Sequence, residues 1–201
     1  MNIDARDARW LDTLHQICNR AAHELKGALN GVAVNLEVVR SRAAKPDMPA
    51  TAVSQFANAA VDQLDGVISM SEAVLSLART AREPVDIAQV IRHVGALLGP
   101  PAKTDGKRLD VEGRFEDLGF SSANGAAVRL AVAESMLAAI DASTHVRCTV
   151  VHFEGRSALQ IAGDDGVTLQ VDSNTVAVVR DAGIRIRAGA ESTAISISFP
   201  D

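Results

Sequence analysis

Apolar side chains recur every three or four residues over the first part of the chain. One series runs from Leu11 to Val39 and a second from Val53 to Ala78. This spacing places the apolar residues on one face of a helix, so we expect two long helices. Pro46 and Pro49 interrupt the pattern, because proline cannot continue a helix. The short connection over 45–50 predicts an antiparallel hairpin.

Shorter patterns alternate from Pro84 onward. Helices are expected over 85–98, 126–142 and 175–180, and strands over 108–112, 146–153, 158–162, 184–187 and 194–199. The first of these helices is predicted to end at Gly99-Pro100-Pro101. Asp172 or Ser173 is the expected N-cap of the last. The expected fold class is α+β, with residues 1–83 as a helical hairpin and residues 84–201 as a small α/β sandwich.

A hairpin of two helices cannot cover its own apolar stripes. Two hairpins can cover one another as a four-helix bundle, so we expect a homodimer through residues 1–83. The alternative is that the hairpin packs on the C-terminal part of its own chain.

Composition narrows the classes of partner. Hydrophobic residues make up 47% of the chain, enough for a core, whereas aromatic residues make up 3% and the net charge is −5. These values argue against binding of nucleic acid or of an anionic membrane surface. No apolar run approaches the roughly 20 residues of a membrane span, and the N-terminus lacks a signal-peptide pattern, so we expect a cytoplasmic protein. Cys18 and Cys148 are expected to be reduced and buried, and no metal-ligand spacing is present.

Residues 23–30 of the first predicted helix read His-Glu-Leu-Lys-Gly-Ala-Leu-Asn. This segment resembles the phospho-acceptor motif of bacterial sensor histidine kinases, in which His-Glu-Leu-Arg-Asn-Pro-Leu is typical. Gly27 and Ala28 replace the usual Asn and Pro. The segment Glu-Pro-Val-Asp-Ile over 83–87 follows the second helix, as it does in those kinases, and the order of elements is similar over nearly the whole chain.

His23 is the expected phosphoryl acceptor. It falls about 200° around the helix from Leu25 on the buried stripe, so it should be exposed, and an exposed imidazole can attack a phosphoryl group. Glu24 is expected to hold the other ring nitrogen or to accept its proton. Lys26 and Asn30 flank His23 on a similar face, and Lys26 could offset phosphoryl charge. The alternative is a solvated histidine without a role. The four other histidines have no supporting neighbours and are expected to be structural or solvated.

The resemblance fails where those kinases bind nucleotide. Glu134 and Ala138 fall at the positions of two family asparagines, and the second of these coordinates the Mg²⁺ of ATP in the family. Ala138 offers no ligand atom. Gly-Asp-Asp-Gly over 163–166 weakly resembles the family motif that recognises the adenine amino group. The alternative is a tight turn between two strands. No glycine-rich lid is present. The resemblance therefore implies a retained scaffold without a cofactor of its own.

A retained histidine without a nucleotide site implies a dimeric histidine phosphotransferase. Such a protein relays a phosphoryl group between receiver domains of response regulators, and the receiver supplies the aspartate and Mg²⁺. One alternative is a non-catalytic pseudokinase that regulates a histidine kinase or a receiver by binding. Another is an active autokinase with an unusual nucleotide site. Gly27 occupies the position where some family members orient water with Asn or Thr, so phosphatase activity is not expected.

Overall fold

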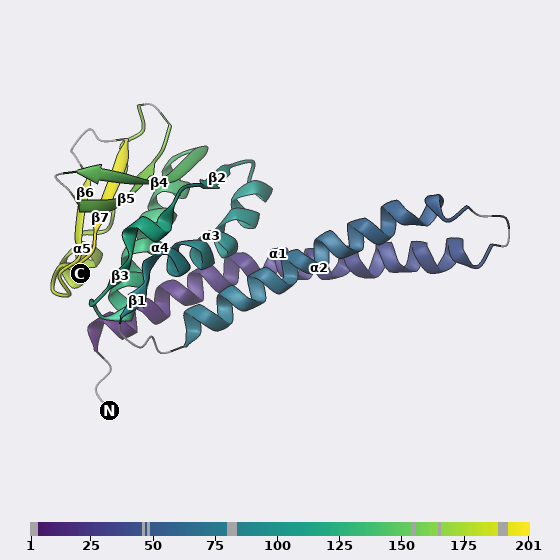
Figure 1. Cartoon of the computed structure of the whole chain (residues 1–201), viewed down its shortest axis with the longest axis horizontal. Coiled ribbons are helices and arrows are strands. Elements are labelled where there is room, and N and C mark those ends of the chain that lie inside the picture. Colours follow the sequence, from purple (N-terminus) through teal and green to yellow (C-terminus); the bar gives the residue numbers. More distant parts are fainter. Residues whose placement is uncertain are drawn as a thin grey trace.

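Two long helices form an arm that projects from a body of helices and strands (Figure 1). The computed structural model describes residues 4–45, 47, 49–79, 84–153, 156–164, 166–188 and 193–201. Helix α1 spans Ala5–Ala43 and α2 spans Thr51–Ala78, which confirms the predicted hairpin. At the tip, the Arg42 guanidinium lies 4.5 Å from the centre of the Phe56 ring and donates to the Ala52 carbonyl at 2.9 Å.

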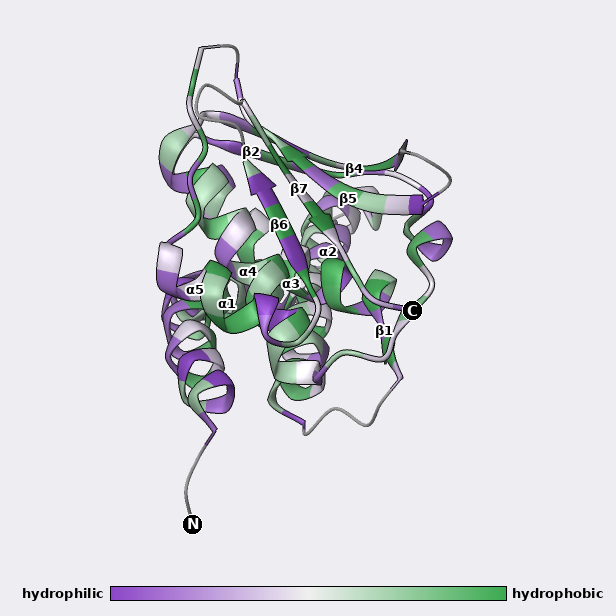
Figure 2. Ribbon diagram, turned by 90° about the vertical axis from the view of Figure 1, so that its left-hand side faces the viewer, coloured by the Kyte–Doolittle hydropathy of each residue, from purple (hydrophilic) through white to green (hydrophobic). Residues whose placement is uncertain are grey.

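The body is a mixed α+β layer, as the sequence predicts. It contains β1 (Val85–Asp86), α3 (Ile87–Thr104), β2 (Arg108–Val111), a 3₁₀ helix (Phe115–Leu118), β3 (Phe120–Ser121), α4 (Gly125–Ala142), β4 (His145–Phe153), β5 (Arg156–Ala162), α5 (Ser173–Arg180), β6 (Arg185–Ala188) and β7 (Ala194–Ser198). The main sheet has the order β2-β4-β5-β7-β6, with β2 and β4 parallel and the other pairs antiparallel. The helices of the body lie on one side of this sheet (Figure 2).

Helix α3 corrects the predicted end at Gly99. It continues through Pro100 and Pro101 to Thr104. Each proline removes one helical hydrogen bond, but Pro101 and Ala102 are buried against the body, and their packing offsets that loss. The carbonyl of Pro101 then accepts from the Asp105 N–H at 3.0 Å, and that of Ala102 accepts from the Lys107 N–H at 2.7 Å. Tertiary packing thus overrides a local signal that usually ends a helix.

The base of the hairpin belongs to the core of the body. Ile17 and Ala21 of α1 and Leu77 of α2 are no more than 1% exposed and pack in the same cluster as α3 and α4. Burial of an Ile or Leu side chain contributes about 1.5–3 kcal/mol each. The hairpin therefore packs on its own chain at this end, as the alternative interpretation has it. The division at residue 83 lies outside the described residues and stays a prediction.

The outer part of the arm carries an uncovered apolar surface. Val34 is 63% exposed, and six further large apolar side chains are between 44% and 60% exposed: Leu29, Leu36, Val61, Leu64, Ile68 and Leu75. At about 100° per residue, the two leucines of α1 and the four residues of α2 fall on the same side of the hairpin. We call these six residues the apolar face.

Within the described part of the chain, no helix is both long and apolar enough to span a bilayer.

Candidate functional site

His23 lies where α1 leaves the body. Ala21, two residues earlier, is fully buried in the core, whereas the His23 side chain is exposed. The exposure expected from the helical periodicity is therefore present. Ile17 and Ala21 hold this part of α1 against the body, so the backbone that carries His23 is fixed by packing.

Lys26 and Asn30 are also exposed and continue the face of His23 along the arm. Residues seven apart in an α-helix are about 20° apart around its axis and about 10 Å apart along it, which describes His23 and Asn30. Lys26 lies one turn from His23, within the reach of an i, i+3 pair. This face points away from the apolar face, so the two surfaces can be occupied at the same time.

Glu24 has a partner that the sequence did not predict. Its Oε2 atom accepts a hydrogen bond from the Thr104 hydroxyl at 2.9 Å. Among the described residues no hydrogen bond joins Glu24 to His23. The expected support of the imidazole by Glu24 is absent from this conformation, and a role for Glu24 in the transfer step stays a prediction.

The contact depends on the unexpected length of α3. A helix that ended at Gly99 would place Thr104 in a loop, and no sequence signal linked it to Glu24. Because α3 runs on through the two prolines, its last residue reaches α1 beside His23.

A second set of contacts covers the part of α4 at which the kinase resemblance places nucleotide. Thr13 donates to Glu134 at 2.6 Å, and Arg20 donates to both oxygens of Asp141 at 3.0 and 3.3 Å. Residues 134, 138 and 141 recur at the four- and three-residue spacing of one helix face. Ala138 thus lies between two positions that are bound to α1. Arg9 adds an ion pair to Asp172 at the start of α5.

Asp164 follows β5 and binds the residues at the start of β4. Its carboxylate accepts from the Thr144 hydroxyl at 2.7 Å and from the backbone N–H groups of Thr144 and His145 at 2.9 and 3.2 Å. The hydrogen bond from the Thr144 hydroxyl is the main cause that lowers the pKa of Asp164 to about 2. These bonds join the end of β5 to the start of β4. Asp165 lies outside the described residues.

Two of the remaining histidines do have polar neighbours, contrary to the sequence-based expectation. His145 Nε2 lies 2.8 Å from Asp110 Oδ2, and His152 Nδ1 lies 3.1 Å from the Ser157 hydroxyl. The parallel pairing of β2 with β4 creates the first contact, and the antiparallel pairing of β4 with β5 creates the second. Neither contact could be read from sequence spacing.

Cys148 is buried as expected, whereas Cys18 is only half-buried. Cys18 and Cys148 are free thiols, and burial raises the pKa of Cys148 to about 12. Such a thiol stays protonated at neutral pH. In the part of the chain that the structure describes, no group of three or more His, Cys, Asp or Glu residues is placed to hold a metal ion.

Three solved structures are similar to the chain in overall arrangement. The first is described as a bacterial phosphotransferase, with 13% identity, a TM-score of 0.47 and 98% of each chain covered. The second, the Acinetobacter baumannii histidine kinase AdeS, has 13% identity and a TM-score of 0.40 over 89% of this chain and 97% of that one. The third, the histidine kinase ThkA in complex with the response regulator protein TrrA, has 14% identity and a TM-score of 0.47 over 98% of this chain and 64% of that one.

No protein-family model and no curated protein sequence matches the chain. The similarity to the three solved structures concerns the path of the backbone.

Proposed function

We propose that the protein is a histidine phosphotransferase that relays a phosphoryl group between receiver domains through His23. The observation that carries the proposal is the position of His23. It is exposed at the junction of arm and body, on a helix whose preceding turns are fixed in the core. A fixed backbone and a free imidazole suit a residue that must meet a partner's reactive group in a defined geometry.

The transfer step needs only the imidazole and the partner. A ring nitrogen lone pair attacks phosphorus, the P–N bond forms, and the bond from phosphorus to the receiver's aspartate breaks to release the carboxylate. The proton on the other ring nitrogen is then free to leave to a base. Glu24 serves as that base only after it exchanges the hydrogen bond from Thr104 for one from His23. Lys26 offsets charge on the phosphoryl oxygens. The return step reverses these bonds on a second receiver, and each receiver brings the Mg²⁺.

The contacts of α4 support a chain that does not use ATP itself. The face with Glu134, Ala138 and Asp141 is bound to α1 through Thr13 and Arg20. Access to that face would require α1 to leave a core that contains Ile17 and Ala21. Phosphoryl transfer from ATP needs metal and phosphate-binding groups, and Ala138 supplies neither.

The apolar face of the arm supports the homodimer. Six large apolar residues on one side of a two-helix arm are a surface that a second arm can cover as a four-helix bundle. His23 points away from this surface, so each copy would present its own histidine. The proposed setting is the cytoplasm, where receiver domains are the partners.

The test is transfer of label from phosphorylated receiver domains. The wild-type chain should acquire acid-labile phosphate, and His23→Ala should acquire none while it keeps its fold. His15→Ala is the matched control, because His15 is an exposed histidine on the same helix. Label on His23→Ala, or none on the wild type with any receiver of a broad panel, would contradict the proposal.

One observation favours the regulatory alternative, in which the chain binds a kinase or a receiver without chemistry. Glu24 is bound by Thr104 and leaves His23 without a partner among the described residues. Tight binding of unphosphorylated and phosphorylated receivers alike, with no label transferred, would support that alternative.

A further inference from the structure

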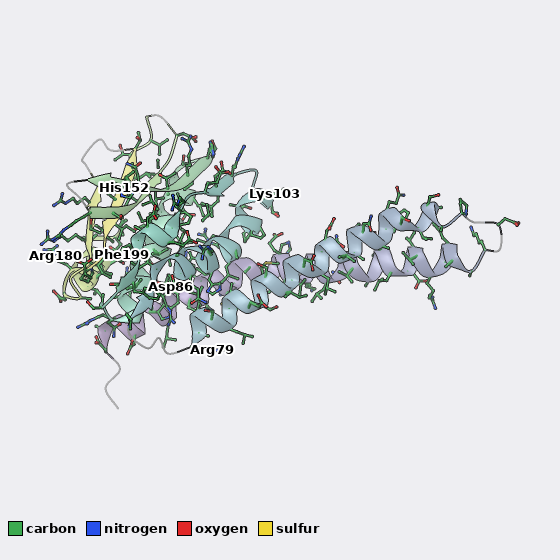
Figure 3. The ribbon with its side chains drawn as sticks, in the orientation of Figure 1. Arg79, Asp86, Lys103, His152, Arg180 and Phe199 are labelled. Carbon is green, nitrogen blue, oxygen red and sulfur yellow. The ribbon has the colours of Figure 1, made fainter. Side chains whose placement is uncertain are left out.

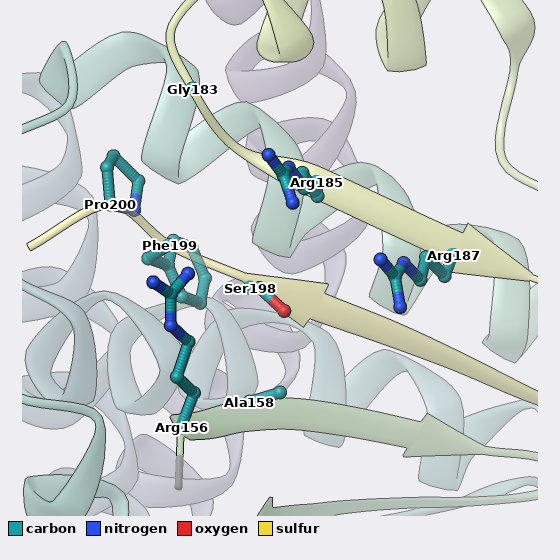
Figure 4. A pocket seen from close by; sticks show the side chains of 8 residues that line it. All are labelled: Arg156, Ala158, Gly183, Arg185, Arg187, Ser198, Phe199 and Pro200. Atoms are coloured by element: carbon teal, nitrogen blue, oxygen red, sulfur yellow. The ribbon is translucent and has the colours of Figure 1, made fainter. Parts of the chain in front are cut away.

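The face of the main sheet opposite the helices carries arginines that take no part in the proposed phosphotransfer. Arg185 and Arg187 lie two residues apart on β6, so both side chains leave the same side of the strand. They pair with Ser198 and Ser196 of β7. Arg156, the first residue of β5, lines the same hollow of about 470 Å³ (Figure 4). We call Arg156, Arg185 and Arg187 the arginine face.

The floor of this hollow is mostly apolar. Ala158, Ser198, Phe199 and Pro200 line it between the arginines. Arginine side chains around an apolar floor are typical of protein–protein interfaces, in which arginine is enriched. Ala158 and Ser198 have short side chains, so a bound chain can approach the sheet closely at these two positions.

The charges of the arginine face are not neutralised within the described part of the chain. All three side chains are exposed, and none forms an ion pair there, whereas Arg9, Arg20 and Arg92 each do. The carboxylates of Asp117 and Asp201 line a neighbouring hollow with Arg156 but form no ion pair with it. The whole chain has a net charge of −5, so the arginine face is a positively charged surface on a negatively charged protein.

The arginine face lies far from His23. Figure 3 places Lys103, the neighbour of Thr104, at the end of the body beside the arm, and Arg180 and Phe199 at the opposite end. Glu24, next to His23, binds Thr104, whereas Phe199 lines the hollow. A partner on the arginine face would therefore leave His23 accessible.

We propose that the arginine face binds a carboxylate-rich segment of a protein partner, laid across β6, β7 and β5. Carboxylates of the segment meet the three guanidinium groups, which bind carboxylates in bidentate geometry. An apolar side chain of the segment lies over Ala158 and Phe199. Nucleic acid fits less well, because three guanidinium groups give few phosphate contacts and the hollow has one aromatic side chain for stacking.

A labelled peptide rich in glutamate with a central leucine is the probe, and its glutamine counterpart is the reference. Fluorescence polarisation should show binding of the glutamate peptide to the full chain. The double variant Arg185→Glu/Arg187→Glu should weaken it at least about tenfold, because like charges then face the peptide. Arg40→Glu/Lys45→Glu changes the net charge equally at two exposed positions near the tip of the arm, and should alter the affinity less than about twofold.

Additional variants and probes distinguish the possible outcomes. Arg185→Gln/Arg187→Gln should also weaken binding, and its thermal unfolding should match that of the wild type because both positions are exposed. Equal losses in the two charge-reversal variants would overturn the proposal, as would absence of peptide binding. Tighter binding of single-stranded DNA or of anionic vesicles, lost in Arg185→Glu/Arg187→Glu, would assign the surface to another class of partner. Label transfer to His23 is read separately, so failure here leaves the proposed function standing.

Discussion

The carboxylate of Glu24 accepts a hydrogen bond from the Thr104 hydroxyl at 2.9 Å, and this contact ties the residue next to His23 to the end of α3. Thr104→Val removes the donor at nearly constant volume and frees the carboxylate. If Glu24 assists the imidazole, label uptake should become faster in this variant, and Glu24→Gln should be slower by about 10- to 100-fold. Single-turnover transfer from a phosphorylated receiver domain measures both rates.

The double variant Thr104→Val/Glu24→Gln supplies the control for this pair. It should match Glu24→Gln, because Thr104 acts only through Glu24. A further change of rate in the double variant would mean that Thr104 acts on the transfer by another route.

The bond from Thr13 to Glu134 should contribute to stability. Thr13 is 3% exposed, and Thr13→Val leaves the half-buried Glu134 carboxylate without its donor. We expect a loss of about 1–2 kcal/mol in the free energy of unfolding. Urea denaturation measures it. Thr13→Val/Glu134→Leu replaces both partners with apolar groups and should recover most of the loss; no recovery would contradict this account.

Arg129 joins α4 to the end of α2 and should stabilise that end. Its guanidinium donates to the Arg79 carbonyl at 2.7 Å and lies 6.0 Å from the Trp10 ring. A cation at a helix C-terminus satisfies open carbonyls and opposes the helix dipole. Arg129→Met keeps much of the packing and should cost about 1–3 kcal/mol. Hydrogen exchange should be faster in the last turn of α2, and unchanged exchange there would count against the capping role.

Asp164 should make stability depend on acid pH. Its folded pKa of about 2 lies below the usual value of an aspartate, so the ionised carboxylate stabilises the fold above the unfolded pKa of about 4. That contribution is lost as the pH falls through about 2. Asp164→Ala should therefore be less stable than the wild type at pH 6, and the difference should shrink between about pH 4 and pH 2. Chemical denaturation across this range tests the sign, and a difference that grows on acidification would refute it.

The apolar face predicts the site of self-association. Ile68→Glu places a charge among apolar residues that are exposed in the single chain, so it should shift the protein from dimer to monomer without loss of fold. Sedimentation measures the mass. Ser69→Glu is the control, because Ser69 is exposed on α2 but points about 100° away from Ile68. A monomeric wild type, or equal effects of the two variants, would argue against this interface.

Elements with local sequence signals could be predicted before the structure was known. The three- and four-residue spacing of apolar side chains marked α1, α2 and α4. The exposure of His23 followed from the same periodicity. These features depend on residues less than two helical turns apart, so the local spacing of residues is enough to predict them.

Features that join distant segments of the chain depend on tertiary packing and could not be predicted from local patterns. The passage of α3 through Pro100 and Pro101 depends on burial against the body, and it brings Thr104 to Glu24 across 80 positions of sequence. The covering of Glu134 by α1 and the meeting of Arg156 with Arg185 depend on how helices and strands pack and on the sheet order β5-β7-β6. The free energy that selects these contacts comes from burial and pairing between segments far apart in the chain, and local propensity does not carry that information.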